Sequence, residues 1–265
     1  MNPTSPTSIN WTLKNSIFEV RLQQEPCNEI GTRMLDGWER FLKEAASSKA
    51  SAVILYSGLS SGFCAGADLR ESYQGMLAVP KKKHESLMRE FIDRIHHVMD
   101  TLDMLPMTTI GVIHGACFGG GFELALTCDL LIAEESARFC FPELRLGIIP
   151  CFGGIPRLKR EVGNALIRDL LFTGRSINAK KAQTVGLVSQ VVADGKGLEV
   201  ARQMAVQTAK FNNETRIAAK KFIKPLPKEE LAKEKDLFLS LFQRPAYIEA
   251  LRKFVESNDL RPYLP

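Results

Sequence analysis

The chain of 265 residues is 45% hydrophobic and 25% charged, which is ordinary for a globular protein and excludes a disordered chain, a fibrous repeat and a disulfide-rich miniprotein. Its net charge of +5 lies in residues 200–265, where 13 Lys and Arg stand against 8 Asp and Glu. Such an excess suits an anionic ligand or a nucleic acid, and equally a solvated helical face.

Short apolar segments alternate with helical patterns over the first 195 residues. Strands are predicted over residues 17–22, 52–56, 109–113, 129–133 and 187–192. Apolar residues at helical spacing predict helices around residues 34–42 and over 84–104. Beyond Gly195 the pattern is helical, with breaks at residues 225–227 and near Pro245. We expect α/β architecture with parallel strands, followed by a helical region.

Neither a membrane span nor a metal site is expected. The most apolar stretch, residues 108–133, is interrupted by His114, Glu123 and Asp129. The six cysteines include no CxxC pair and no zinc-ligand spacing, and most lie in apolar segments where a free cysteine acts as a small hydrophobic residue. Because residues 1–10 also lack the features of a secretory signal, we expect a cytoplasmic protein.

Two loops carry small residues that would let a ligand approach the backbone. Residues 63–68, FCAGAD, follow a predicted strand, and a plain turn capped by Asp68 is the alternative interpretation. Residues 114–123, HGACFGGGFE, place three glycines before an apolar helix. The N–H groups at such a helix start could bind an anion or a developing oxyanion, although the segment matches neither GxGxxG nor a P-loop.

Two glutamates accompany these loops. Glu123 lies in the first turn of the predicted helix and Glu143 follows a proline, and helix starts favour both positions for structural reasons alone. A helix, strand and turn separate them, so they could face each other, and two facing carboxylates can share acid and base work on one water. Burial would raise the pKa of Glu123 and the helix dipole would lower it, so its protonation state is open.

Four segments in order resemble the crotonase superfamily, which is the enoyl-CoA hydratase/isomerase family. They are AGAD at 65–68, GACFGGGFELALTCDLLIA at 115–133, FPELRLGIIP at 141–150 and GLVSQVV at 186–192. The resemblance implies a crotonase-like spiral of ββα units over residues 1–195, carrying an acyl-CoA site, and a C-terminal helical trimerisation region over residues 196–265. It further implies an acyl-CoA thioester as substrate, no metal or redox cofactor, no membrane or nucleic-acid partner, and self-association to a trimer or hexamer.

The sequence of the C-terminal region supports self-association independently of the family. Its helical pattern contains an apolar face that we expect to be too large to stand alone in water. The residues of this face are Leu237, Phe238, Leu241 and Phe242.

The resemblance also assigns roles to single residues. The backbone N–H groups of Ala65 and Gly120 would form an oxyanion hole for the thioester oxygen, while Glu123 and Glu143 would add water to a 2-enoyl thioester. Further substrate-binding positions are Ala67, Asp68, Leu69 and Cys151. Cys151 stands where hydratases usually have glycine, and Phe141 and Phe152 would narrow the acyl pocket.

The presence of both glutamates favours a hydro-lyase, because related double-bond isomerases often keep only one. The alternatives are an isomerase and a dehydratase that acts on a carrier-tethered acyl thioester. An RNA-binding relative is a further alternative, although a protein that only binds RNA has no need of the two glutamates.

Overall fold

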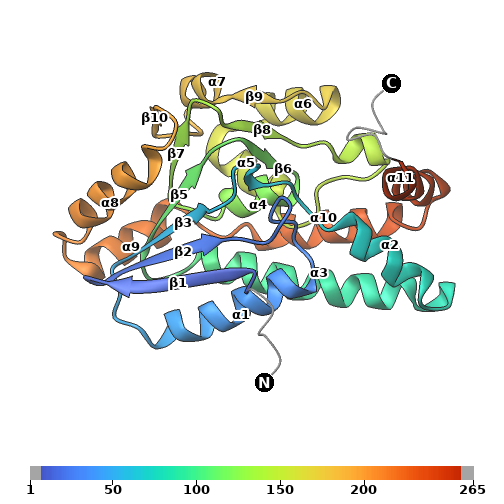
Figure 1. Ribbon diagram of the computed structural model, residues 1–265, viewed down its shortest axis with the longest axis horizontal. Helices are drawn as coiled ribbons and strands as arrows, with labels where there is room; N and C mark the ends of the chain where they lie inside the picture. Colours follow the sequence, from blue (N-terminus) through green and yellow to red (C-terminus); the bar gives the residue numbers. More distant parts are fainter. Residues whose placement is uncertain (1–6, 258–265) are drawn as a thin grey trace.

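Two β-sheets organise the protein, whose computed structural model describes residues 7–257 (Figure 1). The larger sheet has the order β1-β2-β3-β5-β7-β10 and the smaller one the order β4-β6-β8-β9. The strands of the larger sheet are β1 (Ile9–Lys14), β2 (Ile17–Leu22), β3 (Ala52–Ser57), β5 (Thr108–Ile113), β7 (Leu130–Glu134) and β10 (Gln190–Val192). Those of the smaller sheet are β4 (Gly62–Cys64), β6 (Ala116–Phe118), β8 (Arg138–Cys140) and β9 (Ile177–Asn178).

A repeated ββα step builds both sheets. β3, β5 and β7 lie in the larger sheet, and the strand that follows each of them lies in the smaller sheet before the chain turns helical. Pairing is parallel throughout except for β1 with β2 and β8 with β9. This spiral of ββα units confirms the predicted α/β fold.

The helices of the described chain are α1 (Thr32–Ser47), α2 (Leu69–Leu77), α3 (His84–Asp103), α4 (Gly120–Ala125), α5 (Gly154–Val162), α6 (Asn164–Thr173), α7 (Ala179–Thr184), α8 (Gly197–Thr208), α9 (Asn213–Ile223), α10 (Lys228–Leu241) and α11 (Pro245–Glu256), with short 3-10 helices η1 (Lys81–Lys83) and η2 (Glu143–Leu146). Two of them, α1 and α8, pack on opposite faces of the larger sheet. Alternate residues of β2 point to opposite faces, so Phe18 joins the core with Trp38 and Phe41 of α1, while Ile17 joins the cluster that includes Ala201 of α8.

The apolar face predicted on α10 is used within the chain. Phe238 and Phe242 are buried, with ring centroids 6.1 Å apart, and Leu241 is half-buried; only Leu237 is exposed. The prediction that this face needs a second chain to cover it is therefore wrong, because α10 packs on α3 and α5 of the same chain.

The C-terminal helices also close one side of the molecule. α11 contacts both α2 and η2, and it lies beside α2 at the right of Figure 1. Between residues 7 and 257, none of the helices combines the length and the apolar composition that crossing a membrane requires.

Candidate active site

The carboxyl ends of three parallel strands meet at one edge of the smaller sheet. β4 pairs with β6 and β6 pairs with β8, and the chain leaves these strands into residues 65–68, 119–123 and 141–143. The three segments with candidate site residues therefore lie side by side, although they are far apart in the sequence.

A glycine turn joins β6 to α4. Gly119 has a φ of 49°, a conformation that favours glycine, and a Cβ there would stand 2.7 Å from Oε1 of Glu143. Gly120 is the first residue of α4, and the first N–H groups of a helix have no acceptor within it. The turn thus brings the Gly120 N–H and the Glu143 carboxyl group to the same place.

The loop after β4 offers a different N–H group from the expected one. The Ala65 N–H donates to the carbonyl oxygen of Cys27 at 2.9 Å, so it is engaged and Ala65 does not fit the role of oxyanion donor. Ile30 pairs with the loop on both sides of Ala67, which turns the Ala67 N–H the other way. Ala67 N lies 3.4 Å from where a Cβ of Gly120 would stand, and its N–H finds no acceptor within the described part of the chain.

Asp68 has a structural task. Its Oδ1 accepts the N–H of Glu71 at 2.8 Å and so caps α2, which begins at Leu69. Leu69 packs, half-buried, against the main core. The interpretation of this segment as a capped turn is thus correct for Asp68.

Glu123 lies on α4 with only 2% of its surface exposed. Its Oε1 accepts the N–H groups of Phe152 at 2.8 Å and Gly154 at 2.7 Å. Burial raises the pKa of Glu123 to about 7, against the opposing effect of these N–H donors and of Arg157. The group can therefore exchange a proton near neutral pH.

Glu143, at the start of η2, is 8% exposed and has fewer hydrogen-bond partners than Glu123. Its Oε2 is buried without a hydrogen-bond partner among residues 7–257. Burial, and then the charge of Glu123, raise the pKa of Glu143 well above its ordinary value. A buried carboxyl oxygen without a partner is costly and marks a place for a polar ligand.

Aromatic rings pack against one another beside the segments that carry these two glutamates. Phe122 stacks on Phe141 with ring centroids 4.7 Å apart, and Phe91 meets Phe152 edge-on at 6.1 Å. The Phe152 ring lies 2.7 Å from the position of a Cβ on Gly120. The expected narrowing by Phe141 and Phe152 is consistent with this packing.

The backbone of Cys151 has a clearer role in the candidate site than its thiol group. Burial, and then the charge of Glu123, raise the pKa of its thiol well above the ordinary value, so the nucleophilic thiolate is disfavoured. Its carbonyl oxygen lies 2.7 Å from Nε2 of His96, whose pKa is lowered by burial.

Two charged residues beside Glu123 were absent from the sequence-based site. Glu234 of α10 accepts the N–H groups of Gly153 and Ile155, and the fully buried Arg157 of α5 donates to the carbonyl oxygen of Phe152 at 3.0 Å. In the sequence, Glu234 stands in the charged run KEELAKEKD, which is typical of a solvated helix. Only the buried leucines and phenylalanines of that helix hint at which face is turned inward.

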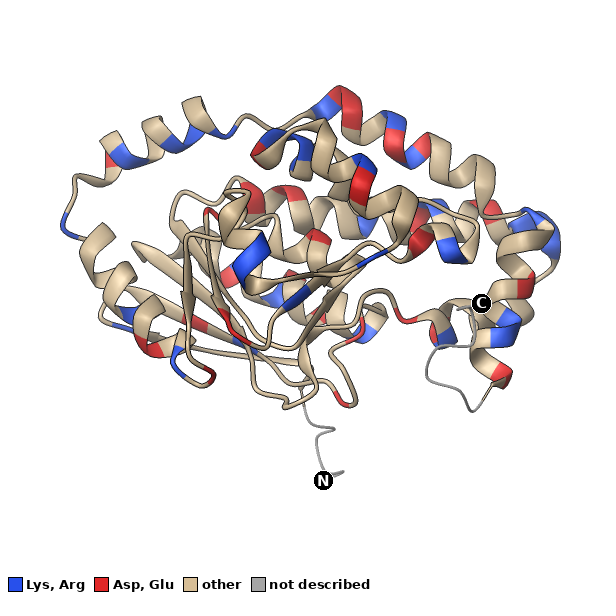
Figure 2. Cartoon of the chain, turned by 90° about the horizontal axis from the view of Figure 1, so that it is seen from above, with Lys and Arg blue, Asp and Glu red and all other residues tan. Residues whose placement is uncertain are grey.

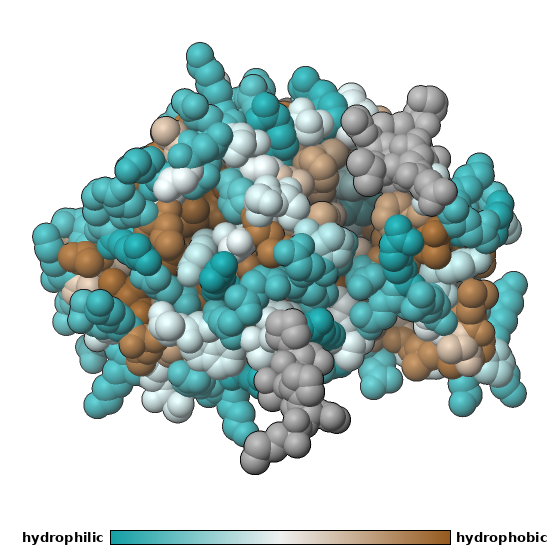
Figure 3. All heavy atoms as spheres, in the orientation of Figure 1, coloured by the Kyte–Doolittle hydropathy of each residue, from teal (hydrophilic) through white to brown (hydrophobic). Residues whose placement is uncertain are grey.

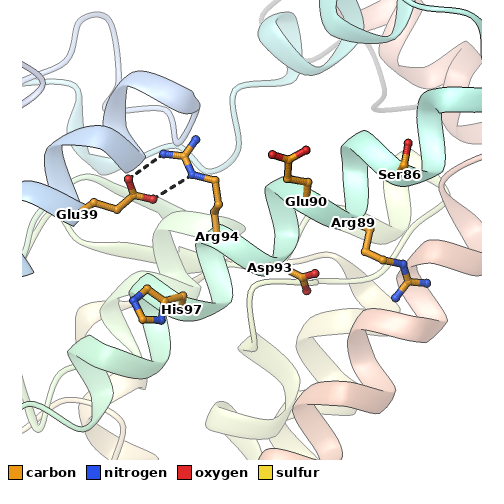
Figure 4. A pocket seen from close by; sticks show the side chains of 7 residues that line it. All are labelled: Glu39, Ser86, Arg89, Glu90, Asp93, Arg94 and His97. Carbon is orange, nitrogen blue, oxygen red and sulfur yellow. Dashed lines mark hydrogen bonds and ion pairs between the residues drawn. The ribbon is translucent and has the colours of Figure 1, made fainter.

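A surface groove of about 510 Å³ between α1 and α3 is a less suitable site (Figure 4). Its seven lining residues are Glu39, Ser86, Arg89, Glu90, Asp93, Arg94 and His97. Arg94 turns toward Glu39 and forms two hydrogen bonds of 3.0 Å with it. Other charged side chains of the groove pair with residues outside it, as Asp93 does with Lys235 and Arg89 with Glu85, instead of converging on a ligand.

Comparison with known proteins agrees with the geometry. Residues 12–261 match the profile of the family described as Enoyl-CoA hydratase/isomerase. A probable enoyl-CoA hydratase of Rhizobium meliloti is 35% identical over 232 residues, which cover 86% of each chain. The mitochondrial methylglutaconyl-CoA hydratase of Rattus norvegicus is 36% identical over 165 residues, covering 62% of this chain and only 50% of that longer protein.

Among solved structures, an enoyl-CoA hydratase from Bacillus halodurans has the same fold. It superposes with a TM-score of 0.83, covering 92% of this chain and 99% of that chain at 21% sequence identity.

Proposed function

The chain belongs to the enoyl-CoA hydratase/isomerase family of enzymes, and on this premise we propose that it is a hydro-lyase that adds water across the double bond of a 2-enoyl-CoA thioester. One observation carries the proposal: two carboxyl groups, Glu123 and Glu143, are buried close enough for the charge of Glu123 to act on Glu143, and both have a raised pKa. An acid and a base side by side are what the addition of water requires.

The two N–H groups that lack acceptors supply the oxyanion hole of the proposal. Those of Ala67 and Gly120 would hold the thioester oxygen as it becomes enolate-like, in place of the pair Ala65 and Gly120. Losing one such donor typically costs roughly 3–4 kcal/mol of transition-state stabilisation.

The different surroundings of the glutamates divide the chemistry between them. Two N–H donors favour the ionised form of Glu123, so it would take a proton from water while the water oxygen bonds to C3. Glu143 lacks such donors on Oε2 and keeps its proton, which it would give to C2 as the enolate collapses. One proton is taken up and one is released, so the product is the 3-hydroxyacyl thioester and the charge of the site is unchanged.

The packing of the site favours a short or branched acyl group. The Phe152 ring stands against Gly120, and Phe91 closes the space behind it. A long straight chain would have to displace one of these rings, and overfilling a packed site typically costs about 1–3 kcal/mol.

A panel of 2-enoyl-CoA thioesters of increasing length tests the proposal. We expect loss of the conjugated thioester absorbance, fastest with short or branched chains, and a product heavier by one water. Glu143→Gln should lower the rate at least ~10²-fold, whereas the exposed Glu135→Gln should not change it. Conversion of 3-enoyl to 2-enoyl thioesters without hydration would instead identify an isomerase, and activity on pantetheine-linked carriers alone would identify a carrier-dependent enzyme.

A further inference from the structure

Glu234 is an unusual residue for its helix. α10 carries charged residues along most of its length, yet Glu234 is 5% exposed. Its Oε2 accepts the N–H of Gly153 at 2.8 Å, and its Oε1 accepts the N–H of Ile155 at 2.9 Å. Burying a carboxyl group is expensive unless its oxygens are bonded, and here both are.

The N–H groups of residues 152–155 alternate between two carboxyl groups. Those of Phe152 and Gly154 point to Glu123, and the two that alternate with them point to Glu234. The segment is thus held from α4 on one side and from α10 on the other, and a shift of one side displaces the donors of the other.

The carbonyl groups of the same loop are fixed as well. His96 of α3 binds the carbonyl oxygen of Cys151, and Arg157 of α5 binds that of Phe152. Gly153 has a φ of 97°, and a Cβ there would stand 1.8 Å from Nη1 of Arg157. The loop therefore has little room to adjust if Glu234 is changed.

We infer that Glu234 is a positioning residue for hydration: it holds the loop that orients the Glu123 carboxylate, and its charge faces that carboxylate across the loop. The inference rests on the proposed function, in which Glu123 is the base. Glu234 itself touches neither the proposed water nor the proposed oxyanion hole.

The charge of Glu234 has a measurable consequence. Glu123 is faced by Glu143 from η2, Cys151 from the loop, Arg157 from α5 and Glu234 from α10. From α3, His96 lies at the loop, and Asp100 and Asp103 pair with the guanidinium of α5. Burial, and then the charge of Glu123, raise the pKa of Glu234. Interacting carboxyl groups titrate as a pair, so replacing Glu234 by an amide should let Glu123 ionise at lower pH.

The test compares Glu234→Gln and Glu234→Asp with the parent protein, on the best thioester of the panel. In Glu234→Gln an amide NH₂ group takes the place of one carboxyl oxygen, so one of the two N–H groups loses its acceptor. We expect kcat to fall about 10-fold or more, because misplacing a reacting group is costly, and KM to stay within two-fold of the parent value. The acidic limb of kcat/KM should also move to lower pH. Glu234→Asp keeps the charge but cannot reach both N–H groups, so its kcat should fall with the limb in place.

Glu230→Gln is the matched control, because Glu230 lies one turn earlier on α10, is only half-buried and pairs with Lys159. It should leave kcat and the pH profile unchanged. An unaltered kcat and acidic limb in Glu234→Gln would overturn the inference, as would a loss of folded protein with full activity per folded molecule. If Glu234→Gln does not fold, an unchanged kcat in Glu234→Asp overturns it. A parent protein that hydrates no thioester contradicts the proposed function as well, whereas an active parent with unaffected variants contradicts this inference alone.

Discussion

Glu123 and Glu143 differ in how their carboxyl groups are held, and this difference predicts the pH profile of the enzyme. As the base, Glu123 must be ionised, so kcat/KM should rise as pH increases through about 7. As the acid, Glu143 must be protonated, so activity should fall again at the higher pH where it ionises. Initial rates over a range of buffers check this, and a rate that keeps rising as pH falls below the pKa of Glu123 would exclude Glu123 as base.

Gly120 is the residue of the proposed oxyanion hole at which an added side chain should lower activity most. A Cβ there meets Phe152 carbons at 2.7 and 2.8 Å, so the ring and the thioester compete for the space beside its N–H. We expect Gly120→Ala to lower kcat/KM about 10²-fold, as a misplacement of about an ångström can do. Gly75→Ala is the control, because no other described residue lies within 4 Å of a Cβ there. If Gly120→Ala folds and stays within a few-fold of the parent, its N–H does not carry the developing charge.

At the scale of elements, the smaller sheet explains both the success and the limits of the sequence analysis. Strands β2, β3, β5 and β7 of the larger sheet were predicted to within a residue, whereas β1 was not predicted. β10 begins at Gln190 and not at 187, because the N–H groups of Leu187 and Val188 bond back to the end of α7. Strands of two or three residues, such as β4, β6 and β8, are too short to show an alternating pattern. Their carboxyl ends place the site, so the candidate segments were found by composition and resemblance but their exact donors were not.

One result of that limit is that the sequence analysis named Ala65 as an oxyanion donor, whereas the hydrogen bonds of the loop favour Ala67. Which N–H of a turn points to the ligand depends on pairing with Ile30 and Cys27, and spacing along the chain does not encode it. Glu234 was missed for a related reason, since only the packing of α10 distinguishes it from its exposed neighbours.

The elements behind the site are joined by buried charges, which predicts a stability effect. Asp103 of α3 is fully buried and binds Arg157, Arg160 and Lys224. Burial alone would raise the pKa of Asp103, but these three cations together lower it. Asp103→Ala removes the one buried carboxylate that these three cations share and should lower the free energy of unfolding by about 3–5 kcal/mol.

Urea unfolding measures this change. The control is Asp36→Ala, which removes an exposed partner of Arg94 and should cost no more than ~1 kcal/mol. Equal effects of the two substitutions would show that the buried network does not connect the elements as described.

At the scale of the whole molecule, two lysines of the basic C-terminal region have internal acidic partners. Lys224 binds Asp103 and Asp129, and Lys220 binds Asp129. Figure 2 shows acidic and basic residues interspersed along most of the helices, while α9 at the upper left carries mainly basic ones. These observations favour the solvated-face interpretation, and we expect no salt-sensitive binding of RNA.

Self-association is predicted from a different surface than the sequence suggested. Exposed apolar side chains of large size occur at both ends of α9. Brown patches are also visible at the left of Figure 3, the side on which α8 lies in Figure 1. Phe211, Phe222 and Ile223 are 61%, 86% and 74% exposed. We expect light scattering to show a trimer or hexamer that Phe222→Asp weakens, and a parent monomer at micromolar concentration would refute this.

The most direct test of the account is the fate of the water oxygen. A short 2-enoyl-CoA is incubated with the protein in isotopically labelled water, and the product is analysed by mass spectrometry. The account predicts one labelled oxygen at C3 with the parent protein and at least ~10²-fold slower labelling with Glu123→Gln and with Glu143→Gln. Labelling at the parent rate in Glu123→Gln, or an unlabelled product of the parent protein, would contradict the two-glutamate hydration mechanism.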